Sequence, residues 1–139
     1  MRHTTLLSIV VIAAFTGCGR QSTTTTTPPK AKTMNCTLEI CGNKQIQNPT
    51  ESDIRQAVYA LDTAKDEAFL ILGPTDMTYI QTSGDQNVGF DLEYQETDAR
   101  HHYRAKRHLT ADEIVKALVE YSTGADDWKT TAEWELIKW

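Results

Sequence analysis

Hydrophobic and polar residues alternate strictly between residues 88 and 95, in the stretch VGFDLEYQ. Val88, Phe90, Leu92 and Tyr94 are apolar, and the residues between them are polar or glycine. A period of two is typical of a strand in a sheet with one buried and one solvated face. Shorter stretches predict further strands: CTLEIC, KQIQ, AFLIL, MTYIQT and the basic ARHHYRAKRH.

The stretch AFLIL, residues 68–72, is apolar at every position instead of at alternate positions. Continuous apolar runs are typical of central strands that are covered on both faces. We therefore expect this strand to be central and buried from both sides. Residues 73–76, Gly-Pro-Thr-Asp, are expected to end it.

Two segments have the periodicity of amphipathic helices. Apolar residues recur at helical spacing, in the first segment at Ile54, Ala57, Val58, Leu61 and Ala64, and in the second at Ile114, Ala117, Leu118 and Tyr121. Thr50 with Asp53 and Thr110 with Glu113 predict the helix starts, and Gly124 predicts the second helix end. With strands clustered between two helices, we expect an α+β domain: an antiparallel sheet of about five strands with both helices packed on one face.

The N-terminal residues have a different composition. The apolar run TTLLSIVVIAAF follows Arg2 and His3 and is typical of a secretory signal, being shorter than the roughly 20 residues that span a bilayer. Residues 15–18, Phe-Thr-Gly-Cys, resemble the lipobox of bacterial lipoproteins, although Phe15 replaces the usual leucine. The resemblance implies a signal peptide over residues 1–17 and lipidation at Cys18. The alternative is an ordinary signal cleaved near residues 13–17, which leaves Cys18 a free thiol.

Residues 18–33 consist of Cys18 and the stretch GRQSTTTTTPPKAKT, which has no large apolar side chain. Such a composition predicts a disordered tether. Residues 34–139 are long enough for one core, and we expect them to form a single domain.

The predicted domain is more acidic than the whole chain. Residues 34–139 carry 19 acidic and 10 basic side chains, a net charge of −9, whereas the whole chain has −5. A domain with this charge repels nucleic acid and anionic lipid and favours basic partners. Four of the bases fall within residues 99–108, where we expect them to lie opposite the acids of the neighbouring strand.

No stretch has the pattern of a phosphate-binding loop, a dinucleotide fingerprint or a zinc site, and we expect no cofactor, no metal and no catalysis. His101, His102 and His108 could bind a metal, but on a strand His101 points away from the other two and the neighbouring bases oppose a cation. Asp91 and Glu93 share one strand face and could act as general acid and base. Surface alternation explains them without a reaction.

Cys36 and Cys41 flank the stretch TLEI. Five residues of extended strand separate their Cα atoms by roughly 16 Å, and a disulfide needs them within about 7 Å. Two buried free thiols are therefore the preferred interpretation, and a mutual disulfide would need the segment to bend. Cys41 paired with a histidine as nucleophile and base has no glycine elbow or oxyanion loop beside it.

Several short motifs, taken in order, resemble immunity protein family 1 of bacterial polymorphic toxin systems. They are QNPT (residues 47–50), Gly89 within VGFDLEY, LTADEI (residues 109–114), and the late tryptophans Trp128 and Trp134. The resemblance covers most of residues 36–139. It implies a small α+β protein that binds a toxin domain, often a nuclease or deaminase, and blocks its active site.

Members of that family are cytosolic, whereas this chain carries a lipoprotein signal. Either the protein intercepts a toxin in the envelope, or the domain has been reused for another binding role; we expect the first, an immunity protein in the cell envelope. Gly19 after the cysteine resembles the outer-membrane sorting pattern of two-membrane bacteria, which implies an anchor on the outer membrane facing the periplasm. The expected partner is a cognate basic toxin. Contact with the membrane is expected only through the lipid anchor, nucleic acid is not a partner, and the domain is a monomer or weak dimer.

The expected toxin contacts are Asp91 and Glu93 on the wet strand face, with Trp128 and Trp134 as anchors, because tryptophan is enriched at binding hot spots. The alternative for the tryptophans is a place in the core. A rival function is a structural or small-ligand-binding envelope lipoprotein, which an apolar pocket of several hundred Å³ would favour. An envelope hydrolase is a third, remote alternative.

Overall fold

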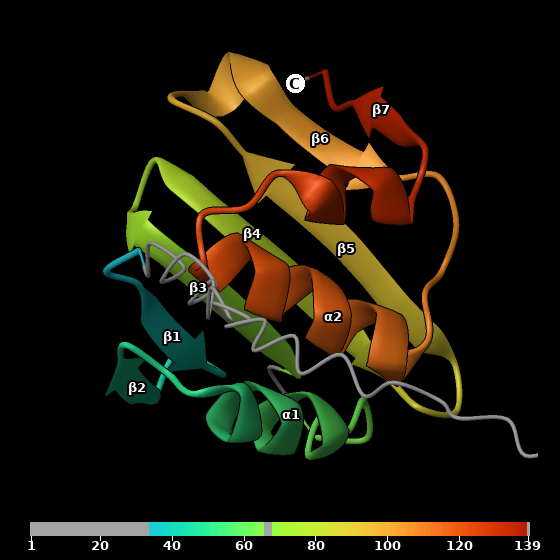
Figure 1. Cartoon of the computed structure of the whole chain (residues 1–139). Helices are drawn as coiled ribbons and strands as arrows, with labels where there is room; N and C mark the ends of the chain where they lie inside the picture. The colour runs from blue at the N-terminus through green and yellow to red at the C-terminus, as the bar shows by residue number, and fades with distance from the viewer. Residues whose placement is uncertain (1–33, 66–67, 139) are drawn as a thin grey trace, which may run out of the picture.

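The computed structural model of the chain describes residues 34–65 and 68–138. These residues form seven strands and two α-helices (Figure 1). The strands are β1 (Thr37–Ile40), β2 (Lys44–Gln47), β3 (Phe69–Thr75), β4 (Thr78–Asp85), β5 (Gly89–Gln95), β6 (His102–Ala105) and β7 (Trp134–Leu136). The helices are α1 (Glu51–Tyr59) and α2 (Ala111–Ser122), with short 3-10 helices η1 (Ala99–His101) and η2 (Asp127–Thr131).

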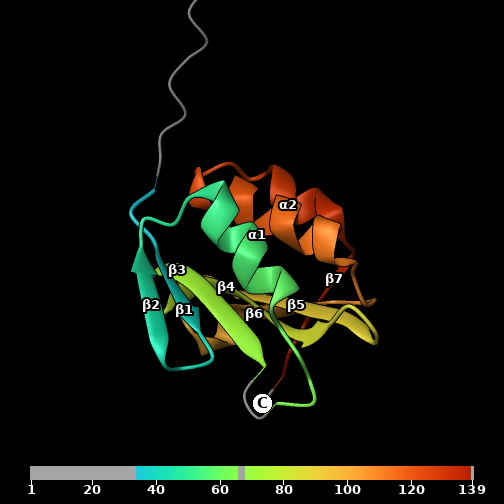
Figure 2. The ribbon, with the colours of Figure 1, turned by 90° about the horizontal axis from the view of Figure 1, so that it is seen from below.

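The strands form one antiparallel sheet in the order β2-β1-β3-β4-β5-β6-β7. Both helices lie on the same side of it (Figure 2). The predicted α+β class is confirmed. The sheet has seven strands instead of about five, because the first hairpin and the short β7 join the same sheet.

The core lies between the sheet and the two helices. Its fully buried side chains come from alternate strand positions and from the apolar helix faces: Leu38, Leu70, Leu72, Ile80, Phe90, Leu92, Ile54, Val58, Ile114 and Leu118. Burying alternate residues of each strand turns the residues between them toward the other face of the sheet.

Both helices begin at the predicted caps. The hydroxyl of Thr50 accepts the N–H of Asp53, and the Asp53 carboxylate accepts the N–H of Thr50. Thr110 and Glu113 exchange the same pair of hydrogen bonds at the start of α2. Gly124, with φ of 73°, follows the C-cap of α2 as predicted.

Strand β3 differs from its prediction in two ways. It runs through Gly73 to Thr75, with an irregular register against β4 after Leu72. Within the described residues, helices cover only the face that carries Leu70 and Leu72, and Phe69 and Ile71 lie half-buried on the other face. The expectation that this strand is covered on both sides is wrong for this part of the chain.

The alternating stretch begins one residue late. Val88 precedes β5 and is 62% exposed, because residues 85–89 make the turn that joins β4 to β5. The basic stretch is shorter as a strand than predicted: residues 99–101 form η1, and only His102–Ala105 pair as β6.

Candidate functional site

In the part of the chain that the structure describes, no helix covers the face of the sheet opposite α1 and α2 (Figure 2), and we call it the open face; Gln95 and His102, near its β5–β6 end, are nevertheless buried there. One row of paired residues crosses it over all seven strands: Gln45, Glu39, Ile71, Gln81, Glu93, Arg104 and Glu135. Each is the register partner of the next, so their side chains project from the same face. Most of the row is polar or charged, with Ile71 the exception.

Glu93 is the centre of a closed polar cluster on the open face. Gln81 Nε2 and Arg104 Nε donate to its carboxylate at 2.8 and 2.7 Å, and His102 Nε2 lies 3.0 Å from Oε2. Burial raises the pKa of Glu93, but the hydrogen bonds from Arg104 and Gln81 outweigh it and lower that pKa. A carboxylate that is held ionised with both oxygens occupied is poorly suited to general acid catalysis near neutral pH.

Asp91 shares the open face with Glu93 but is more accessible. Its side chain is 48% exposed, against 14% for Glu93, and His108 Nδ1 lies 3.3 Å from Asp91 Oδ1. Of the four bases that the sequence predicted to lie opposite the acids of the neighbouring strand, only Arg104 does so, at Glu93. Arg100, Lys106 and Arg107 pair instead with Asp98, Glu133 and Glu113, and His108 lies beside Asp91. Only Asp91 of this acid pair is free to contact another molecule.

The tryptophans lie on the helix side of the sheet. Trp128 is 2% exposed, and its ring contacts Tyr94, Tyr121 and Trp134 edge-on, with centroids 4.8, 5.5 and 5.9 Å apart. Trp134 is half-buried, and its Nε1 donates to the carbonyl of Lys129 at 2.7 Å. Trp128 is thus a core residue and not an exposed anchor. Asp91 and Glu93 are on the opposite face from both tryptophans.

The three neighbouring histidines each contact a different carboxylate. His101 Nδ1 lies 3.1 Å from Asp98, and His102 and His108 contact the two acids of β5. Within residues 34–65 and 68–138, no three His, Cys, Asp or Glu side chains converge on a point that could hold a metal ion. Histidine–carboxylate pairing accounts for this stretch.

Both cysteines of the domain are free thiols. Cys36 is buried, and burial raises the pKa of its thiol. Cys41 is half-buried and its Sγ lies 3.6 Å from the carbonyl oxygen of Phe69. A buried thiol with a raised pKa is a poor nucleophile.

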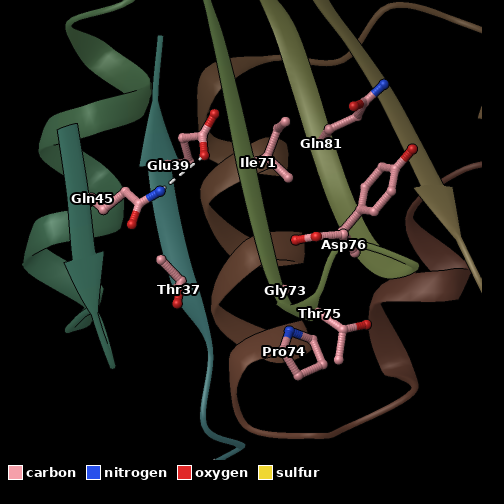
Figure 3. A pocket seen from close by; sticks show the side chains of 10 residues that line it. Thr37, Glu39, Gln45, Ile71, Gly73, Pro74, Thr75, Asp76 and Gln81 are labelled. Carbon is pink, nitrogen blue, oxygen red and sulfur yellow. Dashed lines mark hydrogen bonds between the residues drawn. The ribbon is translucent and has the colours of Figure 1, made fainter. Parts of the chain in front are cut away.

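The open face contains a hollow of about 480 Å³ over β1, β3 and β4, which we call the β3 hollow (Figure 3). The lining residues that matter below are Glu39, Ile71, Gly73, Asp76, Tyr79 and Gln81. In Figure 3, Glu39 lies on the β1 side of the hollow, where Gln45 is hydrogen-bonded to it, and Asp76 lies on the other side, nearer the end of the β3–β4 hairpin. The lining includes no lysine or arginine.

The two carboxylates of the β3 hollow have few partners. Glu39 accepts a hydrogen bond from Gln45 Nε2 at 3.2 Å, and Asp76 has no hydrogen-bond or ion-pair partner among the described residues. The sequence analysis did not single out either residue. In TLEI, Glu39 points to the open face, and Asp76 lies at the turn after β3. Only the pairing of β1 with β3, and of β3 with β4, brings the two residues to one hollow.

A second hollow, of about 270 Å³, adjoins the first along the open face. It shares Ile71 and Gln81 with the β3 hollow and adds Phe69, Asp91 and Glu93. The two hollows place half-buried apolar side chains between carboxylates. This arrangement can hold a cationic group and cover the apolar surface at the same time.

Cys18 and the predicted tether lie outside the described residues, so the lipid anchor stays a prediction. In the part that the structure describes, no helix has the length and apolar character needed to cross a membrane.

Comparisons with known protein families, with curated proteins and with solved structures find no match to this chain. The resemblance to immunity protein family 1 therefore rests on the sequence motifs alone, and function has to be argued from the open face.

Proposed function

We propose that this protein is an immunity protein anchored in the cell envelope, whose domain binds and neutralises a basic toxin domain of nuclease or deaminase type. It does so without catalysis. The observation that carries the proposal is the open face, which combines an uncovered, hollowed sheet surface with accessible carboxylates. Enzymes that act on nucleic acid hold phosphates with basic surfaces, and an acidic protein surface can compete for them.

The charges of the open face support a basic partner. Its carboxylates are Glu39, Asp76, Asp91, Glu93 and Glu135, and its one arginine, Arg104, is bound to Glu93. The remaining carboxylates have no lysine or arginine bound to them among the described residues. Such a surface speeds encounter with a basic protein by electrostatic steering.

The small-ligand alternative has weaker support. That interpretation predicts an apolar pocket with a few polar groups, whereas the β3 hollow surrounds Ile71 with carboxylates, amides and hydroxyl groups. A polar cationic group suits this lining better than an apolar ligand.

A binding measurement with the secreted toxin encoded beside this chain tests the proposal. We expect the full-length chain to bind the toxin and block its activity. Asp91→Ala should slow association and weaken its salt dependence, by roughly threefold at low salt, within the range of about 0.2–1 kcal/mol for exposed charge pairs.

Asp127→Ala removes one exposed acid from η2, on the other side of the sheet, and is the matched control; it should leave association nearly unchanged. Trp128→Ala is unsuitable as an interface test because it opens a cavity in the core. If the chain binds no co-encoded toxin and instead binds a small molecule, the ligand-binding alternative replaces the proposal.

A further inference from the structure

We infer that the β3 hollow receives an arginine side chain of the basic partner, between Glu39 and Asp76. This inference rests on the proposed function and narrows it to one contact. The two carboxylates flank the hollow from different sides, so a guanidinium group that enters it has a carboxylate on either side (Figure 3). Arginine stays protonated under all relevant conditions and has five donors.

The charge of the hollow leaves a place for a cation. Glu39 has only the neutral Gln45 as hydrogen-bond partner, and Asp76 has none among the described residues. Arg104 belongs to the same cross-strand row as Glu39, but it lies on β6, two strands beyond β4, and is bound to Glu93. An incoming cation therefore meets two carboxylates that no base of the described domain neutralises.

The floor of the open face favours arginine over lysine. Ile71 is half-buried in the β3 hollow, on a strand whose other face is fully buried, and Tyr79 adds an aromatic ring to the lining, while Phe69 lines the adjoining hollow. A guanidinium group is planar, weakly hydrated and able to stack on such surfaces, whereas an ammonium group is compact and strongly hydrated. The unexpected apolar positions of β3 would thus be covered by the partner.

The close approach of β3 and β4 at the end of the hollow requires a residue without a side chain, Gly73. A Cβ atom at Gly73 would lie 2.4 Å from the carbonyl oxygen of Thr78 and 2.8 Å from Tyr79 Cβ. Glycine at this position allows β3 and β4 to approach closely at the end of the hollow.

The chain's own basic tether is a less suitable occupant. The first described residue, Met34, donates its N–H to the carbonyl oxygen of Ser122 at the end of α2. Lys30 and Lys32 precede this residue in the sequence, and Met34 lies on the helix side, opposite the open face. A side chain from another protein has direct access.

The test measures fluorescence anisotropy of a labelled peptide of alternating glycine and arginine, added to the full-length chain at low salt. We expect Glu39→Gln combined with Asp76→Asn to weaken binding at least about tenfold, since hydrogen bonds to charged groups contribute strongly. The matched control combines Glu51→Gln with Asp127→Asn, which changes the net charge equally on the helix side, and should change affinity less than about twofold.

Two further probes separate a site from general attraction. A glycine–lysine peptide should bind the unmodified chain several-fold more weakly than the glycine–arginine peptide. Asp76→Lys, at the exposed hairpin tip, should abolish the preference while circular dichroism stays unchanged. The inference would be overturned if the double variant of the hollow and the control double variant lost equal peptide affinity, or if the unmodified chain bound both peptides equally well.

The remaining outcomes distinguish the inference from the proposed function. Tighter peptide binding after Lys30→Gln and Lys32→Gln would show that the tether fills the hollow, and would overturn a partner's arginine as occupant. If the variant with Glu39→Gln and Asp76→Asn neutralises the toxin as well as the unmodified chain does, the inference fails and the proposed function stands. If no toxin binds but the peptide results are as expected, the β3 hollow is an arginine-binding site and the proposed function fails.

Discussion

Individual carboxylates of this domain differ in role because their neighbours differ. Asp76 is exposed and has no partner among the described residues, whereas Glu93 is enclosed by donors. Asp85 is the extreme case, since it is 5% exposed and accepts four hydrogen bonds. The N–H and hydroxyl of Thr63 donate to Oδ2, and the N–H groups of residues 87 and 88 donate to Oδ1. Asp85 therefore ties the loop after α1 to the β4–β5 turn.

These hydrogen bonds, led by the Thr63 hydroxyl, lower the pKa of Asp85 to about 2. Because this pKa is lower in the folded state than in the unfolded state, the stabilisation is present above about pH 4 and is lost as the pH falls toward 2. We expect Asp85→Asn to lower the melting temperature at pH 7, and the difference from the unmodified chain to shrink to near zero at pH 2. Thermal unfolding at several pH values measures it.

Asp127→Asn, an exposed acid of η2, is the control and should show little difference at any pH. A constant difference for Asp85→Asn between pH 7 and pH 2 would contradict the role of the ionised carboxylate.

Among the elements, β3 connects the fold with the candidate site. One of its faces carries Leu70 and Leu72 into the core, and the other presents Phe69 and Ile71 to the two hollows. Its irregular end, at residues 73–75, shapes the β3 hollow together with the turn that carries Asp76. The stability of this hairpin and the shape of the hollow should therefore change together.

Gly73→Ala tests that coupling. The added methyl group meets backbone and Cβ atoms that cannot rotate away, so we expect a loss of about 2 kcal/mol in the free energy of unfolding, within the usual range for overpacking. Urea unfolding measures it, and arginine-peptide binding should weaken in the fraction that stays folded. Pro74→Ala, at the exposed next residue, should cost much less. Equal stability of the two variants would show that β3 and β4 separate without cost.

At the scale of the whole molecule, the two sides of the sheet differ in what covers them. The helices and the aromatic cluster close one side, and no helix covers the open face on the other (Figure 2). Met34, the first described residue, is bound to the end of α2 on the helix side.

The anchor itself has a direct test. From the lipobox resemblance we expect the mature protein to begin at a lipidated Cys18 and to partition into detergent, because two or more acyl chains hold a protein stably on a membrane. Cys18→Ser should abolish partitioning or block processing, as seen by phase separation and mass spectrometry. An unmodified Cys18 thiol on the mature protein would contradict the anchor.

Local patterns in the sequence were enough to predict much of the fold. The capping boxes at Thr50 and Thr110 depend on residues three apart, and strand alternation depends on neighbours, so both could be identified without tertiary contacts. The same alternation placed Asp91 and Glu93 on one face, but of the four neighbouring bases only Arg104 lies opposite them.

Properties that depend on distant residues were decided only by the tertiary structure. Whether Trp128 is core or surface depends on Tyr94 and Tyr121, which belong to other elements. Apolar residues on both faces of β3 suggested burial from both sides, because a sequence does not say how many layers cover a sheet. The β3 hollow joins Glu39 to Asp76 through strand register, a long-range pairing that side-chain pattern alone does not specify.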